Sequence, residues 1–129
     1  MDFPLWTLLG GLVLLQFKHF LFDFVFQTSY QLKNKGTYAH PGGILHSGLH
    51  AAGSLPAIFL FSPSSALVTG LVVAEFAIHY HMDWLKERIV RTTGWTQKDA
   101  RYWHLFGVDQ LVHSLTYTAM LTILMLYGR

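Results

Sequence analysis

The chain has 129 residues, of which 52% are hydrophobic, 16% aromatic and only 12% charged, and its formal net charge at neutral pH is +2. Soluble domains carry about 25% charged residues, so half that fraction predicts an integral membrane protein. The small net charge gives no indication of nucleic-acid binding, and we expect no nucleic-acid partner. The absence of cysteine excludes disulfides and thiolate metal sites.

Apolar runs divide the chain into helices of about the 20 residues that are needed to cross a bilayer core. The predicted helices cover residues 4–27, 42–61, 66–86 and 104–127. Pro56 lies inside the second run, where a proline can kink a helix. We therefore predict an all-α, integral membrane four-helix bundle that forms a single transmembrane domain over residues 1–129.

The basic residues predict the orientation of this bundle. Lys33 and Lys35 lie between the first and second runs, and the segment Lys86–Arg101 between the third and fourth runs is also rich in lysine and arginine. The other side carries only Asp2, an uncharged serine-rich turn and Arg129. The positive-inside rule then places both basic loops in the cytoplasm and both termini on the non-cytoplasmic side.

Each run carries one pair of polar residues four positions apart, which puts both side chains on one face of a helix. The pairs are His19/Asp23, His46/His50, His79/Asp83 and Asp109/His113. Counted from the expected cytoplasmic boundary, each pair lies roughly four to eight residues deep, or about 6–12 Å. We expect these polar faces to converge in one layer on the bundle axis.

The order of these motifs repeats along the chain. An HxxxD helix, a basic loop and a second helix with a polar pair occur in the first half and again in the second half. This repetition predicts two helical hairpins related as a pseudo-repeat about an axis along the membrane normal.

Histidines and aspartates gathered in one layer predict a metal centre, because imidazole and carboxylate together suit zinc, iron and manganese. Eight donors exceed the four of a single tetrahedral ion, so we predict one or two divalent transition-metal ions, with zinc favoured over manganese or iron. The predicted metal ligands are His19, Asp23, His46, His50, His79, Asp83, Asp109 and His113. Some of them could act as hydrogen-bond partners of ligating histidines instead.

Other interpretations of the polar residues stay open. Each pair could be a hydrogen-bonded, neutralised pair that only stabilises the bundle. A tetrapyrrole held between histidines is disfavoured by the nearby carboxylates, since the macrocycle needs apolar walls. Glu75, one turn deeper than His79, is a tentative catalytic base or a buried neutral acid. Lys86 could contact a phosphate, although snorkelling toward the interface is the favoured role.

The motifs resemble those of a known family. They read HFLFDFVFQT at 19–28, HSGLH at 46–50, HYHMDWLK at 79–86 and DQLVH at 109–113. In this combination they resemble a family of small bacterial and phage inner-membrane proteins catalogued as a domain of unknown function. That family is distantly similar to the YdjM-like inner-membrane metal-dependent hydrolases. The resemblance implies metal binding, hydrolytic activity and a place in the bacterial inner membrane.

We predict a membrane-embedded, dinuclear metal-dependent hydrolase that acts near the cytoplasmic leaflet on a phosphoester or lipid head group. The alternative is a non-catalytic transmembrane subunit of a larger membrane complex or homo-oligomer, in which the polar layer is structural or binds a metal or tetrapyrrole. Transport is disfavoured because the outer halves of the helices, such as 8–15 and 121–126, offer almost no polar path.

Overall fold

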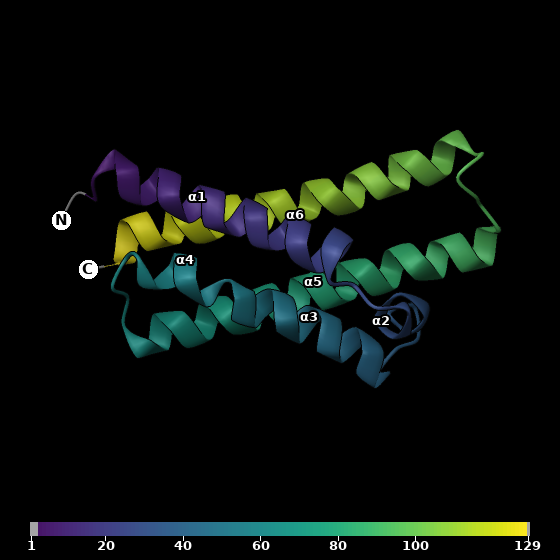
Figure 1. Ribbon diagram of the computed structural model, residues 1–129, viewed down its shortest axis with the longest axis horizontal. Coiled ribbons are helices and arrows are strands. Elements are labelled where there is room, and N and C mark those ends of the chain that lie inside the picture. Colours follow the sequence, from purple (N-terminus) through teal and green to yellow (C-terminus); the bar gives the residue numbers. More distant parts are fainter. Residues whose placement is uncertain (1–2, 129) are drawn as a thin grey trace.

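The computed structural model describes residues 3–128, which are helical throughout apart from turns and short connections (Figure 1). The elements are α1 (Leu5–Phe20), the π-helix η1 (Leu21–Val25), α2 (Ser29–Asn34), α3 (Pro41–Gly53), α4 (Leu55–Phe59), α5 (Ser65–Thr93) and α6 (Ala100–Tyr127). No β-strand occurs in this part of the chain, which confirms the predicted all-α class. Asp2 and Arg129, used above to orient the bundle, lie outside the described residues.

The helical runs lie lengthwise beside one another (Figure 1). The start of α1, the end of α6 and the turn between α4 and α5 are at one end of the bundle, while α2 and the α5–α6 connection are toward the other. α3 packs on α5, α5 on α6, and α1 on both α6 and α4. Both basic loops therefore share one end of the molecule.

Two helices are interrupted where the sequence predicted continuous runs. α1 continues into a π-helix, in which the Phe26 amide donates to the Leu21 carbonyl at 2.7 Å. The second run breaks at Ser54 into α3 and α4. Pro56 lies within the first two positions of α4, and because proline has no amide hydrogen it cannot continue the hydrogen bonds of α3.

The last two helices are longer than predicted at their loop ends. α5 runs to Thr93 instead of residue 86, and α6 begins at Ala100 instead of 104. Gly94 ends α5 with a φ of 70°, a left-handed conformation that glycine adopts without steric cost. At the other end of α5, Ser64 Oγ accepts a hydrogen bond from the Leu67 amide and caps the helix.

The interior is divided into an apolar half and a polar half. The apolar half lies toward the termini and consists of Leu15, Ala57, Ile58, Phe61, Leu71, Tyr117, Met120, Leu121 and Leu124. The buried residues toward the loops are mostly polar or charged, and include Gln31, Lys35, His46, Asp83, Lys86 and Asp109. Buried polar groups are costly unless they are paired, so this half needs partners for its charges.

Two of the described helical stretches, Leu5–Val25 and Ser65–Thr93, are long and apolar enough to cross a membrane. α3 and α4 are short because of the break at Ser54, and strongly polar side chains such as Gln110 and His113 lower the hydropathy of α6. Two such helices are weak evidence, because a signal sequence or the core helix of a soluble protein has the same length and composition. The four membrane crossings therefore stay a prediction.

Candidate metal centre

The four polar pairs occupy one face of their helices, as their spacing predicted. The Nε2–Oδ distances are 3.2 Å in His19/Asp23, 3.5 Å in His79/Asp83 and 3.1 Å in Asp109/His113, and the rings of His46 and His50 have centroids 4.7 Å apart. All these side chains are buried, with at most 10% of any side chain exposed in the three mixed pairs. The polar faces of the four helices converge in the interior of the protein.

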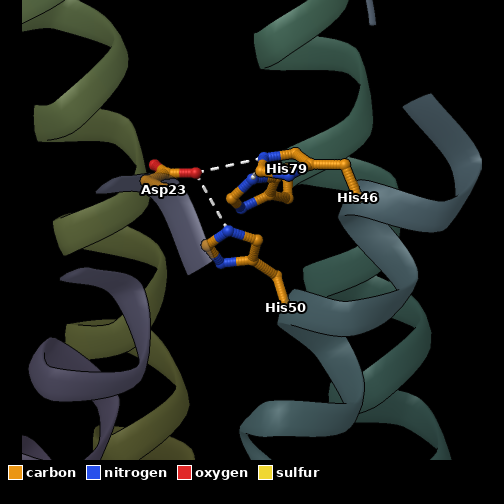
Figure 2. Close-up of side chains that lie close together, drawn as sticks. All are labelled: Asp23, His46, His50 and His79. Carbon is orange, nitrogen blue, oxygen red and sulfur yellow. Dashed lines mark hydrogen bonds and ion pairs between the residues drawn. The ribbon is translucent and has the colours of Figure 1, made fainter. Parts of the chain in front are cut away.

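One group of donors joins the π-helix to α3 and α5 (Figure 2). Asp23 Oδ1 lies 3.0 Å from both His46 Nε2 and His50 Nε2. His79 Nε2 lies 3.4 Å from His46 Nε2. One ligand atom from each of these four residues lies within 4.8 Å of the others, so a single ion could contact them all.

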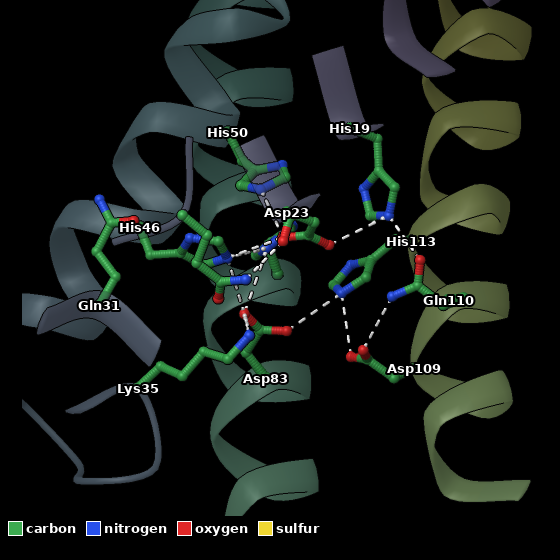
Figure 3. Close-up of polar contacts among 12 residues, drawn as sticks. His19, Asp23, Gln31, Lys35, His46, His50, Asp83, Asp109, Gln110 and His113 are labelled. Atoms are coloured by element: carbon green, nitrogen blue, oxygen red, sulfur yellow. Dashed lines mark hydrogen bonds and ion pairs between the residues drawn. The ribbon is translucent and has the colours of Figure 1, made fainter. Parts of the chain in front are cut away.

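A second group consists of His79, Asp83 and His113, from α5 and α6. Figure 3 shows Asp83 and His113 of this group with their polar contacts. Asp83 Oδ1 is 3.4 Å from His113 Nε2, while Asp83 Oδ2 is 3.5 Å from His79 Nε2 and 3.1 Å from His46 Nε2. The two oxygens of Asp83 thus face different histidines. This carboxylate connects the second group to the first.

The distances between donors match those of a metal site. Ligands 2.0–2.1 Å from a tetrahedral zinc ion lie about 3.3 Å from one another. Hydrogen bonds alone explain the arrangement less well, because His46 Nε2 faces Asp23, Asp83 and His79 together and carries at most one hydrogen. The buried histidines and aspartates could therefore hold a metal ion, with the donors already close to one another.

His19 and Asp109 lie outside both groups and contact their members. His19 Nε2 is 3.2 Å from Asp23 Oδ2 and 2.9 Å from Gln110 Oε1, and Asp109 Oδ1 is 3.1 Å from His113 Nε2. Contacts of this kind orient ligating side chains in metalloproteins. The structure thus gathers six of the eight predicted ligands into two groups that share His79, with the other two beside them.

Glu75 lies one turn from His79 on α5 and is 1% exposed. It forms an ion pair with Lys18, whose Nζ also donates to the His50 carbonyl at 2.8 Å. Glu75 belongs to neither donor group and does not line the cavity described below. Its suggested role as a catalytic base stays a prediction.

Two residues that contact the centre were not predicted. Lys35 Nζ lies 3.4 Å from Asp83 Oδ2, and the lysine is only 4% exposed. The Tyr117 hydroxyl is 3.0 Å from His19 Nδ1. Tyr117 follows His113 by one helical turn, so helical spacing could have identified it. Lys35 comes after the short α2 helix, where no periodicity indicates which way a side chain faces.

A cavity of about 500 Å³ adjoins the centre at the loop end of the bundle. Its polar lining includes Asp23, Lys35, Lys86, Asp109 and Gln110. Its apolar lining includes the exposed side chains of Phe24, Leu32 and Trp103, so the cavity reaches the surface. Because Asp23 also belongs to the first donor group, a molecule in this cavity would lie next to the donors.

Comparison with protein families gives one match. Residues 12–128 match a family described as a protein of unknown function (DUF3307). This agrees with the family of unknown function expected from the motifs, and it says nothing about YdjM-like hydrolases. No curated protein and no solved structure shows significant similarity to the chain.

Proposed function

Since the chain belongs to the DUF3307 family, whose function is unknown, we propose its role from the site itself: a membrane-embedded hydrolase that depends on divalent metal ions. The observation that carries the proposal is the convergence of imidazole and carboxylate donors from different helices, at ligand spacing, next to a cavity. A divalent ion at this site would supply Lewis-acid polarisation of an ester oxygen and would acidify a water molecule. Zinc is the favoured ion.

The side chains around the ion would have different roles. Asp83 belongs to the second group and also faces His46 of the first, so it would be shared if two ions bind. Asp23 belongs to the first group and also lines the cavity, so a substrate in the cavity would lie close to an ion that Asp23 helps to bind. Asp109 and Gln110 line the same cavity beside His113, where they would position a substrate or a water molecule.

The surface supports a membrane location. α1 exposes Trp6 (79%), Val13 (64%) and Phe17 (59%), and α6 exposes Leu115 (57%) and Leu126 (68%). Only 28% and 22% of the residues in the apolar windows of the two candidate spans are buried, whereas a core helix of a soluble protein is mostly buried. Exposed apolar surface of this extent suits contact with lipid. We propose that all four helical runs cross the membrane, with both basic loops in the cytoplasm.

Metal content tests the centre. We expect the protein, purified in detergent, to contain one or two equivalents of zinc, manganese or iron by elemental analysis. His50→Ala and Asp83→Asn should each lower the affinity for the metal by more than about 100-fold. Loss of an outer hydrogen-bond partner of a ligand typically lowers this affinity only about 10- to 100-fold. His81→Ala is the matched control, because His81 is exposed and contacts Tyr38 away from the donor groups.

Activity tests the hydrolase. Hydrolysis of a chromogenic phosphate ester should require added metal and should be lost in Asp83→Asn but kept in His81→Ala. Wild-type protein without bound metal would contradict the whole proposal. Bound metal without hydrolysis of any phosphate or carboxylate ester tested would instead favour the accessory-subunit interpretation.

A further inference from the structure

We infer that the cavity beside the metal centre binds the phosphate group of a phosphate ester, and that Lys35 and Lys86 hold this group. The inference rests on the proposed function, because it takes the metal centre to be loaded. It assigns a role to two lysines that come from different segments and line the same cavity.

Both lysines are buried, which is unusual for this residue type. Lys35 is 4% and Lys86 8% exposed. Lys35 Nζ lies 3.4 Å from Asp83 Oδ2, and Lys86 Nζ lies 3.3 Å from Asp109 Oδ2. Burying an ammonium group is costly unless the charge has a partner. The two ammonium groups are therefore held by the carboxylates of the centre, at the boundary between the donors and the cavity.

The balance of charge changes when metal binds. Asp23, Asp83 and Asp109 outnumber the two lysines by one charge, and Glu87, 3.4 Å from Lys86, adds another negative charge. Without metal, this region is net negative and should repel an anion. Two divalent ions would add four positive charges and leave the region net positive by two, which is the charge that a phosphate monoester neutralises. Metal should therefore bind before phosphate.

The remaining lining suits the rest of an ester. Gln27, Gln97 and Gln110 offer amide groups to the cavity, and Gln27 Oε1 is buried without a hydrogen-bond partner among the described residues. At the surface, Phe24 and Trp103 are 56% and 53% exposed. A phosphate with an attached apolar group would match a charged interior and an aromatic opening. A lysine ammonium group binds phosphate as a point charge, whereas arginine needs its planar guanidinium group to be aligned with the phosphate oxygens.

Phosphate binding by the purified protein tests the inference. Titration calorimetry with inorganic phosphate should detect binding to metal-loaded wild-type protein and none to metal-free protein, a comparison that needs no substitution. Lys86→Met and Lys35→Met should each weaken phosphate binding about 10- to 100-fold, as expected for loss of a hydrogen bond to a charged group. Phosphate is titrated at saturating metal, where both variants should carry the wild-type amount of metal, because neither lysine supplies a ligand.

Lys33→Met is the matched control. Lys33 is exposed, lies two positions from Lys35 and does not line the cavity, so this variant should bind phosphate like the wild type. Lys35→Met and Lys86→Met variants that keep their metal and bind phosphate with wild-type affinity would overturn the phosphate site and leave the metal centre standing. Phosphate binding that is equal with and without metal would also overturn it. A wild-type protein that takes up neither metal nor phosphate would overturn both proposals.

The phosphate ester could come from solution or from a lipid head group, and reconstitution separates these sources. The protein would be placed in nanodiscs of phosphatidylcholine, with or without phosphatidate. If phosphatidate raises the apparent Kd for inorganic phosphate at least 10-fold, a lipid phosphate occupies the cavity. If glycerol 3-phosphate competes and phosphatidate does not, the ligand is soluble. Competition by neither ester would contradict a phosphate-ester site.

Discussion

Lys18 and Glu75 form a buried ion pair on the apolar side of the histidines, where α1 meets α3 and α5. Lys18 is 6% and Glu75 1% exposed. Lys18 Nζ also lies 4.6 Å from the centre of the Tyr117 ring, so this ammonium group of α1 contacts three other helices, α3, α5 and α6. Each charge depends on the other, because neither is solvated.

We expect removal of one partner of this ion pair to be costly. Lys18→Met and Glu75→Leu should each lower the free energy of unfolding by about 3–5 kcal/mol, because each leaves an uncompensated buried charge. The double variant should recover most of this loss. Thermal unfolding in detergent measures all three. Additive losses in the double variant would show that the two residues act independently.

At the scale of single residues, spacing predicted which side chains share a face but not how they meet across helices. All four pairs were identified because positions i and i+4 lie one turn apart on any α-helix. That Asp83 faces His46 and His113, and that Lys35 reaches Asp83, depends on how the helices are rotated and how far apart they are. No local pattern carries this information.

At the scale of elements, α1 approaches α6 and the turn after α4 closely at Gly11. A Cβ atom at this position would lie 2.8 Å from Leu121 Cδ2 and 3.1 Å from Phe61 Cε2. A glycine here allows the two helix surfaces to approach, as small residues do in membrane bundles. The position of the His19/Asp23 pair relative to the Asp109/His113 pair of α6 therefore depends on this contact.

Gly11→Leu should push α1 away from α6. We expect a lower melting temperature and weaker metal binding, although no ligand changes, because a large side chain in a packed interior costs about 1–3 kcal/mol or more. Gly70→Leu is the matched control, since nothing lies within 4 Å of a Cβ at Gly70 and that helix should tolerate the substitution. Equal effects of both substitutions on metal content would contradict this account.

The irregular helices show which element features a sequence can indicate. Pro56 indicated a kink in the second run, and the helix does break two residues earlier, at Ser54. The π-helix at Leu21–Val25 had no such signal, because its extra residue per turn is tolerated only where the surrounding contacts stabilise it. It carries Asp23, which reaches both His46 and His50. Such π-turns occur frequently at functional sites.

At the scale of the whole molecule, the basic loops lie at one end of the bundle, and the start of α1 and the end of α6 lie at the other (Figure 1). This arrangement fits the proposed orientation in the membrane. The two donor groups and the cavity lie toward the end with the basic loops, and the apolar cluster lies toward the opposite end. A substrate would therefore enter from the side of the basic loops.

The absence of cysteine allows a direct test of this orientation. Lys98→Cys, in the α5–α6 connection, and Ser65→Cys, at the start of α5, place single thiols at exposed positions at the two ends. In inverted inner-membrane vesicles, an impermeant maleimide should label Lys98→Cys and not Ser65→Cys, and intact spheroplasts should show the reverse. Labelling of both from one side would contradict the proposed topology.

The sequence by itself determined the helical class, the approximate helix positions, the four polar faces and the common end of the basic loops. These properties follow from local periodicity, composition and the alternation of helix direction, which do not require knowledge of packing. Only the tertiary structure decided the division into two donor groups that share His79, the central place of Asp83, the burial of Lys35 and the cavity. The reason is that distances between helices depend on contacts such as that at Gly11 and on breaks such as that at Ser54, which act between residues far apart in the chain.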